Sequence, residues 1–471
     1  MQRMSPLDAS FLHLENAISH MHIGSVAIME GPPPAYADVV RMVAGKLPHV
    51  PRYRQVVCAV PLHLGRPVWA DDPNFEIAYH VRHTALGRPG DDDQLRRLVG
   101  RVMGQQLDRS RPLWEIWMVE GLAADRWALV TKTHHAMVDG VSGAELLGLI
   151  FDVAPEGSPP LPDAWRPAAL PTPASLTRDA LTDLVLSPYE QFRAVRASLR
   201  RPQEALARVR EVVAATRSAS SVVRSTPGSS LNGPIGPHRR WTFARTSVAE
   251  VRAARAAHGG SFNDVVLAAI TNGFRELLLA RGEPTTRVVR TMVPVSVRPR
   301  NESGTAVGDG QLANQVSAMF ADLPVHVADP VDALHLLSAQ LDGLKESRQA
   351  VAGEVLVALS GFAMPMLFAL GARAATRAPN RTVNTVTTNV PGPQFPLYAA
   401  GRRCVEMYPY VPIGVQIRVA VAIFSYAGSV GFGITGDYDT TADLDVVATG
   451  IESAMRRLTP QPKKARKRAR A

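Results

Sequence analysis

Cysteine is nearly absent from this chain of 471 residues, which holds only Cys58 and Cys404. Two cysteines so far apart in sequence exclude a disulfide framework and a cysteine-rich zinc cluster. A reducing compartment is the simplest interpretation. The N-terminal segment also reaches Glu15 without the apolar core of a secretory signal. These absences predict a cytoplasmic protein.

Acidic residues are absent from the C-terminal end, and this changes how the net charge of +10 is interpreted. Residues 461–471 carry six of those ten charges and are predicted to form a solvated, disordered tail. Contact with anionic lipid is the alternative, at about 1 kcal/mol for each basic residue near a membrane. Nucleic acid is not indicated, because no recognised nucleic-acid module accompanies the tail. The basic side chains of the tail are Lys463, Lys464, Arg466, Lys467, Arg468 and Arg470.

Composition predicts a globular chain of two or three domains, since 46% of its residues are hydrophobic. Residues 1–153 mix short apolar strands with helices and are predicted to form one α/β unit. Residues 154–228 combine a proline-rich connector with a basic helical linker. Residues 229–460 alternate strand and helix patterns. Within them we expect a helix over 262–280, a buried strand over 290–297 and two strands over 415–434.

Two segments have both a structural and a membrane interpretation. Between residues 188 and 224 there are eight Arg and three Glu, typical either of two packed helices with solvated basic faces or of an amphipathic membrane-surface element. Residues 355–372 form an 18-residue stretch without charge, the threshold length for a membrane span. Ser360, Gly361 and Pro365 interrupt this stretch, so a buried helix or helical hairpin is favoured. Lining an acyl-chain site or docking on lipid is a further hypothesis for it.

The most informative segment is the run from His134 to Gly140, which contains His134, His135 and Asp139. It lies where the apolar stretch 127–130 gives way to a turn and then to a helical pattern. Three interpretations compete: a turn with satisfied polar side chains, a metal site of two histidines and one carboxylate, and acid–base catalysis. Adjacent strand residues point to opposite faces, so the two histidines have different roles.

Six blocks, taken in order along the chain, resemble the bacterial wax ester synthase/diacylglycerol acyltransferase family, and its mycobacterial members in particular. The run 134–140 matches the HHxxxDG motif of the coenzyme-A-dependent acyltransferase superfamily. Any one block is weak evidence, but six in the order of the family are a strong signal. The other five are residues 4–11 (MSPLDASF), 112–114 (PLW), 261–268 (SFNDVVLA), 293–298 (VPVSVR) and 388–393 (TNVPGP).

The resemblance implies a fold and a mechanism. The fold is α/β, with two chloramphenicol-acetyltransferase-like sandwich subdomains, mixed sheets and a reaction channel between them. The second histidine of the motif, His135, is implied to be the general base that takes the proton of the acceptor hydroxyl. No covalent acyl-enzyme is needed, in keeping with the absence of a nucleophile elbow or a Cys–His signature. His134 is implied to support the loop.

Weaker assignments follow for the neighbours. Asp139 is expected to hold the shape of the motif by pairing with an arginine, for which Arg298 is the candidate. Gly140 fits a tight turn beside the channel. Asn263 and Asp264 are expected either to donate a hydrogen bond to the site or to cap the helix that starts there. The 112–114 and 389–393 blocks are expected to be architectural. No metal is expected in the site.

The predicted reaction is long-chain acyl-CoA:diacylglycerol O-acyl transfer making triacylglycerol, with wax ester synthesis from fatty alcohols as a further activity. Acyl-CoA is the co-substrate, no bound cofactor is expected, and no glycine-rich loop marks the coenzyme A site. The protein is expected to associate peripherally with the inner membrane or with lipid droplets. The alternatives are a same-fold acyltransferase acting on another lipid hydroxyl or amine, and a catalytically silent lipid-surface protein.

Overall fold

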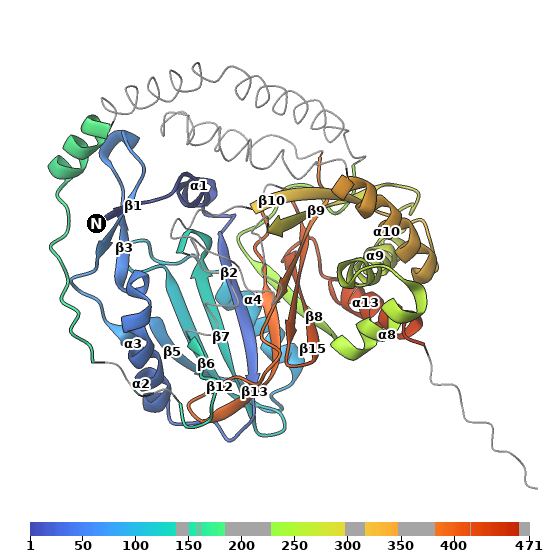
Figure 1. The fold of residues 1–471 in the computed structure, drawn as a ribbon, viewed down its shortest axis with the longest axis horizontal. Helices are drawn as coiled ribbons and strands as arrows, with labels where there is room; N and C mark the ends of the chain where they lie inside the picture. The colour runs from blue at the N-terminus through green and yellow to red at the C-terminus, as the bar shows by residue number, and fades with distance from the viewer. Residues whose placement is uncertain are drawn as a thin grey trace, which may run out of the picture.

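Two α/β halves lie side by side, each built on a six-stranded sheet (Figure 1). The sheets are mixed, as the resemblance predicts. The computed structural model describes residues 1–137, 150–157, 159, 162–183, 228–296, 316–346, 382–414 and 416–460.

The first sheet has the strand order β12-β13-β2-β7-β6-β5. Its members are β2 (His22–Met29), β5 (Val81–Ala85), β6 (Trp114–Leu122), β7 (Arg126–His134), β12 (Tyr398–Ala399) and β13 (Arg402–Tyr410). Only β5 and β6 run parallel, and the other neighbours are antiparallel. The central pair is in register over its whole length, with His22 opposite His134 and Met29 opposite Trp127.

The second sheet has the order β10-β9-β11-β14-β15-β8. Its strands are β8 (Arg239–Ser247), β9 (Val289–Ser296), β10 (Val316–Leu323), β11 (Thr385–Pro391), β14 (Val419–Tyr426) and β15 (Ser429–Asp437). β11 runs parallel to both β9 and β14, and the remaining pairs are antiparallel.

Strand β13 connects the halves, because it comes from the second half of the chain and pairs with β2 of the first sheet. It also passes close to β15 of the second sheet. A Cβ at Gly433 would lie 1.7 Å from the Pro409 carbonyl oxygen, and one at Gly431 would lie 2.4 Å from that of Met407. Glycine is therefore required on β15, since no side chain fits between the two sheets there.

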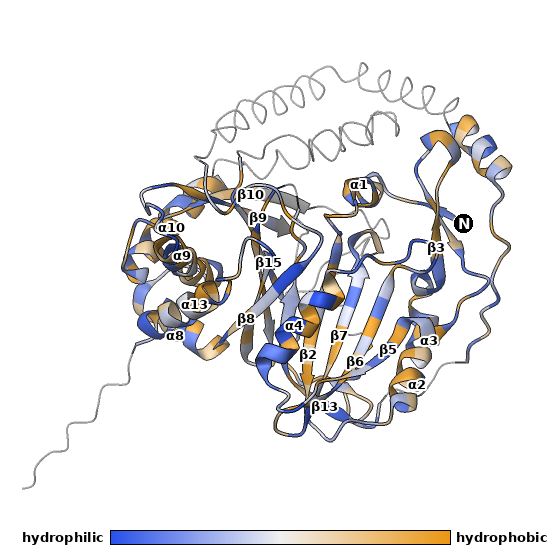
Figure 2. Ribbon diagram, turned by 180° about the vertical axis from the view of Figure 1, so that it is seen from behind, coloured by the Kyte–Doolittle hydropathy of each residue, from blue (hydrophilic) through white to orange (hydrophobic). Residues whose placement is uncertain are grey.

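Helices cover both faces of the first sheet. α4 (Asp92–Met103) begins with a capping box at Asp91 and buries one side of its surface, including Leu95, Val99 and Met103. Figure 2 shows hydrophilic and hydrophobic residues on α4, as expected for a helix that packs on one face only. That face packs with β2, β7 and Trp241. The opposite face of the sheet packs with α1 (Pro6–Leu14) and α2 (Tyr36–Lys46), and α3 (Ile77–His80) lies beside them.

A second helical layer covers the second sheet on its outer side (Figure 1). It consists of α8 (Val248–His258), α9 (Phe262–Ala280), α10 (Pro330–Glu346) and α13 (Asp445–Leu458). α9 is buried along most of its length and provides Val265, Ile270 and Phe274 to the apolar core. A Cβ at Gly450 of α13 would lie 2.8 Å from the Cα of Gly273, so small residues set the close approach of α9 and α13.

A small third sheet extends the first half, with the order β1-β4-β3. Its strands are β1 (Gln2–Arg3), β3 (Gln55–Cys58) and β4 (Val68–Asp71). Short 3-10 turns link these parts: η1 (Leu47–His49), η2 (Pro51–Arg54), η3 (Pro61–His63) and η4 (His135–Met137). Residues 173–183 form a further helix.

The element predictions are confirmed where the structure describes them. The expected helix over 262–280 is α9 with the same bounds, and the expected strand over 290–297 is β9. β14 and β15 are the two strands expected over 415–434. The Arg-rich stretch 188–224, the uncharged 355–372 stretch and the basic tail 461–471 all lie outside the described residues. Among the helices that the structure describes, none combines the length and apolar character of a membrane span.

Candidate active site

The two histidines lie where β7 ends. Residues 127–134 are all buried, which suits the apolar run that opens this strand. His134 is the last strand residue, and its backbone N–H donates to the Leu113 carbonyl (2.9 Å). His135 begins turn η4, and its N–H donates to the Met21 carbonyl (2.8 Å). The backbone is therefore held from both sides at the point where the strand becomes a turn.

The His135 ring is half-buried and stacks on Phe11, with 4.0 Å between ring centroids and 28° between the ring planes. Burial lowers the pKa of His135 to about 4. The imidazole is therefore neutral at pH 7, the form in which it can accept a proton. The neutral ring, stacked on Phe11 at the end of β7, can accept a proton, and its lowered pKa makes it a weaker base than an ordinary histidine.

Helix α1 brings Phe11 to this ring. Ser5 caps the helix by accepting the Asp8 N–H (3.1 Å), and Pro6 occupies the first turn, where its missing N–H has no consequence. Met4, just before the cap, is buried and donates its backbone N–H to Pro67. The N-terminal MSPLDASF block thus anchors a short helix against the histidine turn.

His134 points to the other side of the sheet, into a buried polar cluster. The ring is 0% exposed, and its Nε2 lies 3.6 Å from Glu15 Oε2. His22, its cross-strand partner on β2, has its Nε2 3.3 Å from the other Glu15 oxygen. Lys132, two residues earlier on the same face of β7, donates to the carbonyls of Val102 (3.0 Å) and Gln105 (2.5 Å).

Burial and charge act in opposite directions on these groups. Burial opposes ionisation of Glu15, but the nearby His134 and His22 rings and two hydrogen bonds from Arg109 outweigh it and hold the pKa of Glu15 below its usual range. Burial lowers the pKa of His22 to about 3 and that of Lys132 to about 8. The cluster is therefore arranged around one ionised carboxylate.

The Asn263–Asp264 pair lies at the start of α9. The Asp264 side chain forms the capping box with Ser261 and also accepts from the Ser338 hydroxyl of α10 (2.6 Å). Asn263 accepts from the Asn389 amide (3.4 Å), which links two of the family blocks. Within the described part of the chain, no hydrogen bond joins Asn263 to either histidine.

Three predicted site residues, Asp139, Gly140 and Arg298, lie outside the described residues. The metal interpretation also needs Asp139 as a ligand. Among residues that the structure describes, no group of three or more His, Cys, Asp or Glu side chains is placed to hold a metal ion.

Sequence reasoning missed five residues that contact the histidines: Phe11, Glu15, Met21, His22 and Leu113. Phe11 and Leu113 lie in blocks that carry the family resemblance, but a block does not reveal which ring or carbonyl it supplies. Glu15 and His22 have no motif of their own. They meet His134 only because β2 pairs with β7 and α1 ends beside that pair.

Comparison with known proteins decides the family. The wax ester synthase/diacylglycerol acyltransferase catalytic domain matches residues 4–266, and the WS/DGAT C-terminal domain matches residues 312–459. A probable diacylglycerol O-acyltransferase of Mycobacterium tuberculosis is 37% identical over 97% of this chain and 96% of its own. The chain belongs to the wax ester synthase/diacylglycerol acyltransferase family. It is therefore an acyltransferase, and the predicted family is confirmed.

Solved structures agree on the fold of this wax ester synthase/diacylglycerol acyltransferase family member. The wax ester synthase/diacylglycerol acyltransferase of Marinobacter aquaeolei VT8 aligns with a TM-score of 0.67 at 24% identity, over 97% of this chain and 98% of that one. A trichothecene 15-O-acetyltransferase of Fusarium sporotrichioides aligns with a TM-score of 0.60 at 12% identity, over 98% and 95%. The first condensation domain of the calcium-dependent antibiotic synthetase aligns with a TM-score of 0.57 at 15% identity, over 97% and 95%.

Proposed function

We propose that this protein transfers a long-chain acyl group from acyl-CoA to diacylglycerol, making triacylglycerol, with His135 as the general base. The observation that carries the assignment of the base is the His135 ring. It is half-buried, its pKa is lowered to about 4, and it is stacked on Phe11 at the end of β7. Acyl-CoA is the co-substrate, and the proposal requires no bound cofactor.

The proposed step is a direct displacement at the thioester. The acceptor hydroxyl oxygen forms a bond to the thioester carbonyl carbon as His135 takes the hydroxyl proton, and the carbonyl electrons move onto oxygen. The tetrahedral intermediate then collapses by breaking the carbon–sulfur bond. The leaving thiolate receives the proton from His135, so the products are the ester and free coenzyme A.

General acid–base catalysis is typically worth roughly 10²- to 10⁴-fold in rate. The larger share of the acceleration must come from positioning the two substrates and from stabilising the oxyanion. Phe11 and the backbone hydrogen bonds of His134 and His135 supply positioning for the base. The roles proposed for Asp139, Gly140 and Arg298 remain those implied by the family motif.

The experiment is turnover of radiolabelled palmitoyl-CoA by the purified protein with dioleoylglycerol or hexadecanol, run beside His135→Ala. We expect labelled triacylglycerol that disappears in the variant while its thermal melt is unchanged. Product from hexadecanol would add wax ester synthesis. Equal turnover in the variant would remove His135 as the base.

Two other results identify the alternatives. Hydrolysis of the thioester with neither product would keep an acyl-CoA enzyme but assign the acceptor to another lipid hydroxyl or amine. No turnover with any acceptor would favour a silent lipid-surface protein. Loss of activity with a strong chelator, restored by a divalent ion, would revive the metal interpretation.

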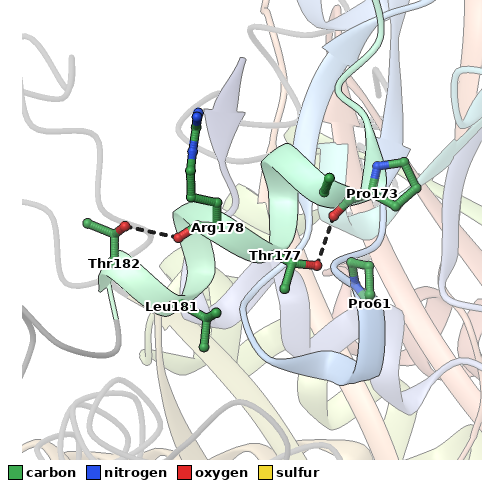
Figure 3. Close-up of a pocket in the computed structure, with 7 residues that line it drawn as sticks. Pro61, Pro173, Thr177, Arg178, Leu181 and Thr182 are labelled. Atoms are coloured by element: carbon green, nitrogen blue, oxygen red, sulfur yellow. Dashed lines mark hydrogen bonds between the residues drawn. The ribbon is translucent and has the colours of Figure 1, made fainter.

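A lipid surface is the proposed place of work, since diacylglycerol and triacylglycerol partition into membranes and droplets. The described structure offers one candidate contact. An open groove of about 840 Å³ lies between the 173–183 helix and the η3 turn, lined by Pro61, Leu181 and Arg178 among others (Figure 3). Leu62, at the tip of that turn, is 80% exposed with φ of +53°, which is unusual for a non-glycine residue.

This groove lies next to the helix that supports the base. His63 of η3 contacts His13 of α1 edge to face, with 5.8 Å between ring centroids, and α1 carries Phe11. Exposed leucines suit a surface that inserts apolar side chains into lipid, and the exposed Arg178, which also contacts Asp179, places a positive charge beside them. These features support peripheral association with the inner membrane or with lipid droplets.

Flotation with anionic phospholipid vesicles tests the contact. We expect Leu62→Glu combined with Leu181→Glu to reduce the floated fraction, because carboxylates neither insert into lipid nor approach anionic headgroups. Leu336→Glu is the matched control, since Leu336 is 50% exposed on α10 of the other half. Equal flotation of the double variant and the wild type would reject this face as the lipid contact.

A further inference from the structure

Glu15 is a buried acid that lies directly behind the histidine turn. It follows α1 as the C-cap residue, and its side chain is only 1% exposed. One carboxylate oxygen lies 3.6 Å from His134 Nε2 and accepts from Arg109 at 3.0 Å and 2.6 Å. The other lies 3.3 Å from His22 Nε2. An ionised carboxylate at this depth is tolerated because the Arg109 guanidinium donates two hydrogen bonds to one of its oxygens.

The hydrogen bonding of His134 orients its ring toward this acid. Its Nδ1 accepts the backbone N–H of Ala136 (3.1 Å), so a neutral ring carries its proton on Nε2. Nε2 is the atom that faces Glu15. The ring therefore connects the carboxylate on one side with the backbone of η4 on the other.

That backbone is the part of the chain that carries the base. Ala136 directly follows His135, and the His135 N–H is held by Met21 on the other side. The peptide groups that flank the His135 side chain are thus restrained by Met21 and by His134. A displaced His134 ring would release one of these two restraints and let the His135 imidazole move away from its position over Phe11.

We propose that Glu15 is a positioning residue for acyl transfer: acting through His134, it fixes the backbone turn that aims the His135 imidazole. This inference rests on the proposed function of His135. Glu15 touches neither substrate, because its carboxylate faces His134, His22 and Arg109 inside the fold.

The first test is Glu15→Gln, which keeps the shape of the side chain and removes its charge. We expect kcat to fall by about 10- to 100-fold, by analogy with residues that orient a metal-ligating histidine from behind. KM for both substrates should change little, since an aiming defect acts on the transition state. Glu120→Gln is the matched control, because Glu120 also faces a histidine (His83, 3.1 Å) but at a half-exposed site on β6. It should keep wild-type turnover.

A double-mutant cycle separates positioning from general damage. If Glu15 acts through His134, then Glu15→Gln should have almost no further effect on kcat in a His134→Ala background. Additive losses in the cycle, or full activity of Glu15→Gln, would overturn the proposal. His135→Ala in the same assay distinguishes failure of the proposed base from failure of the proposed role of Glu15. An active His135→Ala variant rejects His135 as the base. An inactive His135→Ala variant beside a fully active Glu15→Gln variant rejects the role of Glu15 alone.

Stability is monitored by thermal melting of each variant. If Glu15→Gln unfolds because Arg109 loses its partner, the comparison is repeated with Arg109→Met against Arg109→Met/Glu15→Gln. Removing both members of an ion pair is less disruptive than leaving the buried Glu15 carboxylate without the Arg109 charge, although Arg109 itself is half exposed. The same 10- to 100-fold fall in kcat between these two variants would support the proposal, and equal kcat values would overturn it.

Discussion

The central strand pairs of the two sheets bury different kinds of polar side chain. β2 and β7 bury the ionisable side chains of His22, Lys132 and His134, and Glu15 lies against them. In the β11–β14 pair the buried polar side chains are Thr385 and Thr387 of β11, which are not ionisable. Thr385 donates to the Val419 carbonyl, and Thr387 accepts from the Thr291 hydroxyl. The contrast holds for the central pairs, because the second sheet buries the ionisable Arg239, Arg290 and Asp437 on its other strands.

Burying an ionisable group costs free energy unless it is paired, whereas a threonine hydroxyl needs one hydrogen bond. In the first sheet the buried ionisable side chains lie at the strand ends next to His135, where the reaction is proposed to occur. The second sheet supports α9 and an almost wholly apolar core. From this difference we predict that the first half positions the proposed reaction and that the second half contributes mainly stability. Four predictions test this division, from the largest expected effect to the smallest.

Phe274→Ala should cost about 3–5 kcal/mol of unfolding free energy, because this ring is 0% exposed in the core around α9. At temperatures well below its melting point, the variant should keep the KM and kcat of the wild type. Urea unfolding and initial rates measure the two effects. A large fall in kcat of the folded variant would show that the second half contributes directly to the site.

The fall of kcat/KM at acidic pH should occur at a lower pH than an ordinary histidine base would give. The pKa of His135 is lowered to about 4, so its base form persists as the pH falls and is lost only as the pH drops through that value. Activity at about pH 5.5 should therefore stay close to that at pH 7, where an ordinary histidine of pKa about 6.5 would have lost about tenfold. Circular dichroism checks the fold, and a tenfold fall over this interval in folded protein would contradict the assignment.

The lowered pKa values of His135 and His22 should also make the folded state less stable at acidic pH. The folded pKa values of His135 and His22, about 4 and about 3, lie below the ordinary value for histidine. The unfolded chain therefore takes up protons first as the pH falls. The stability that these neutral rings contribute is complete above about pH 6.5 and is lost as the pH falls toward the folded values.

Phe11→Leu should lower kcat by up to about tenfold, since aromatic pairs contribute about 0.5–1.5 kcal/mol beyond the area they bury. Leucine fills a similar volume but does not stack on the His135 ring. The melting temperature should change little, because Phe11 is only partly buried. Unchanged kcat would show that the two backbone hydrogen bonds are sufficient to hold His135.

Ser261→Ala should cost about 1 kcal/mol of unfolding free energy and leave kcat unchanged. Its hydroxyl accepts the Asp264 N–H (3.2 Å) and forms one part of the capping box of α9. Chemical denaturation gives the free energy. A fall in kcat without a fall in stability would indicate that the Asn263–Asp264 pair belongs to the site rather than to the helix cap.

Much of the fold could be predicted locally. α9 has the predicted bounds because Ser261 and Asp264 form a capping box and apolar residues follow without interruption. β14 and β15 are separated by a tight turn at Ala427 and Gly428, which the sequence marks. Strand β13 shows the limit of this approach. It lies in the second half of the chain, yet it pairs with β2 in the first sheet, and no local pattern encodes a partner so distant in sequence.

The candidate site divides in the same way. The order of the six blocks identified the family, and the HHxxxDG run marked His134 and His135, because these signals are short and contiguous. Only the tertiary structure decided that Phe11 stacks on one ring and that Glu15 and His22 face the other. The physical reason is that helix caps and strand periodicity depend on neighbours along the chain, whereas these contacts depend on the register of β2 with β7 and on where α1 ends.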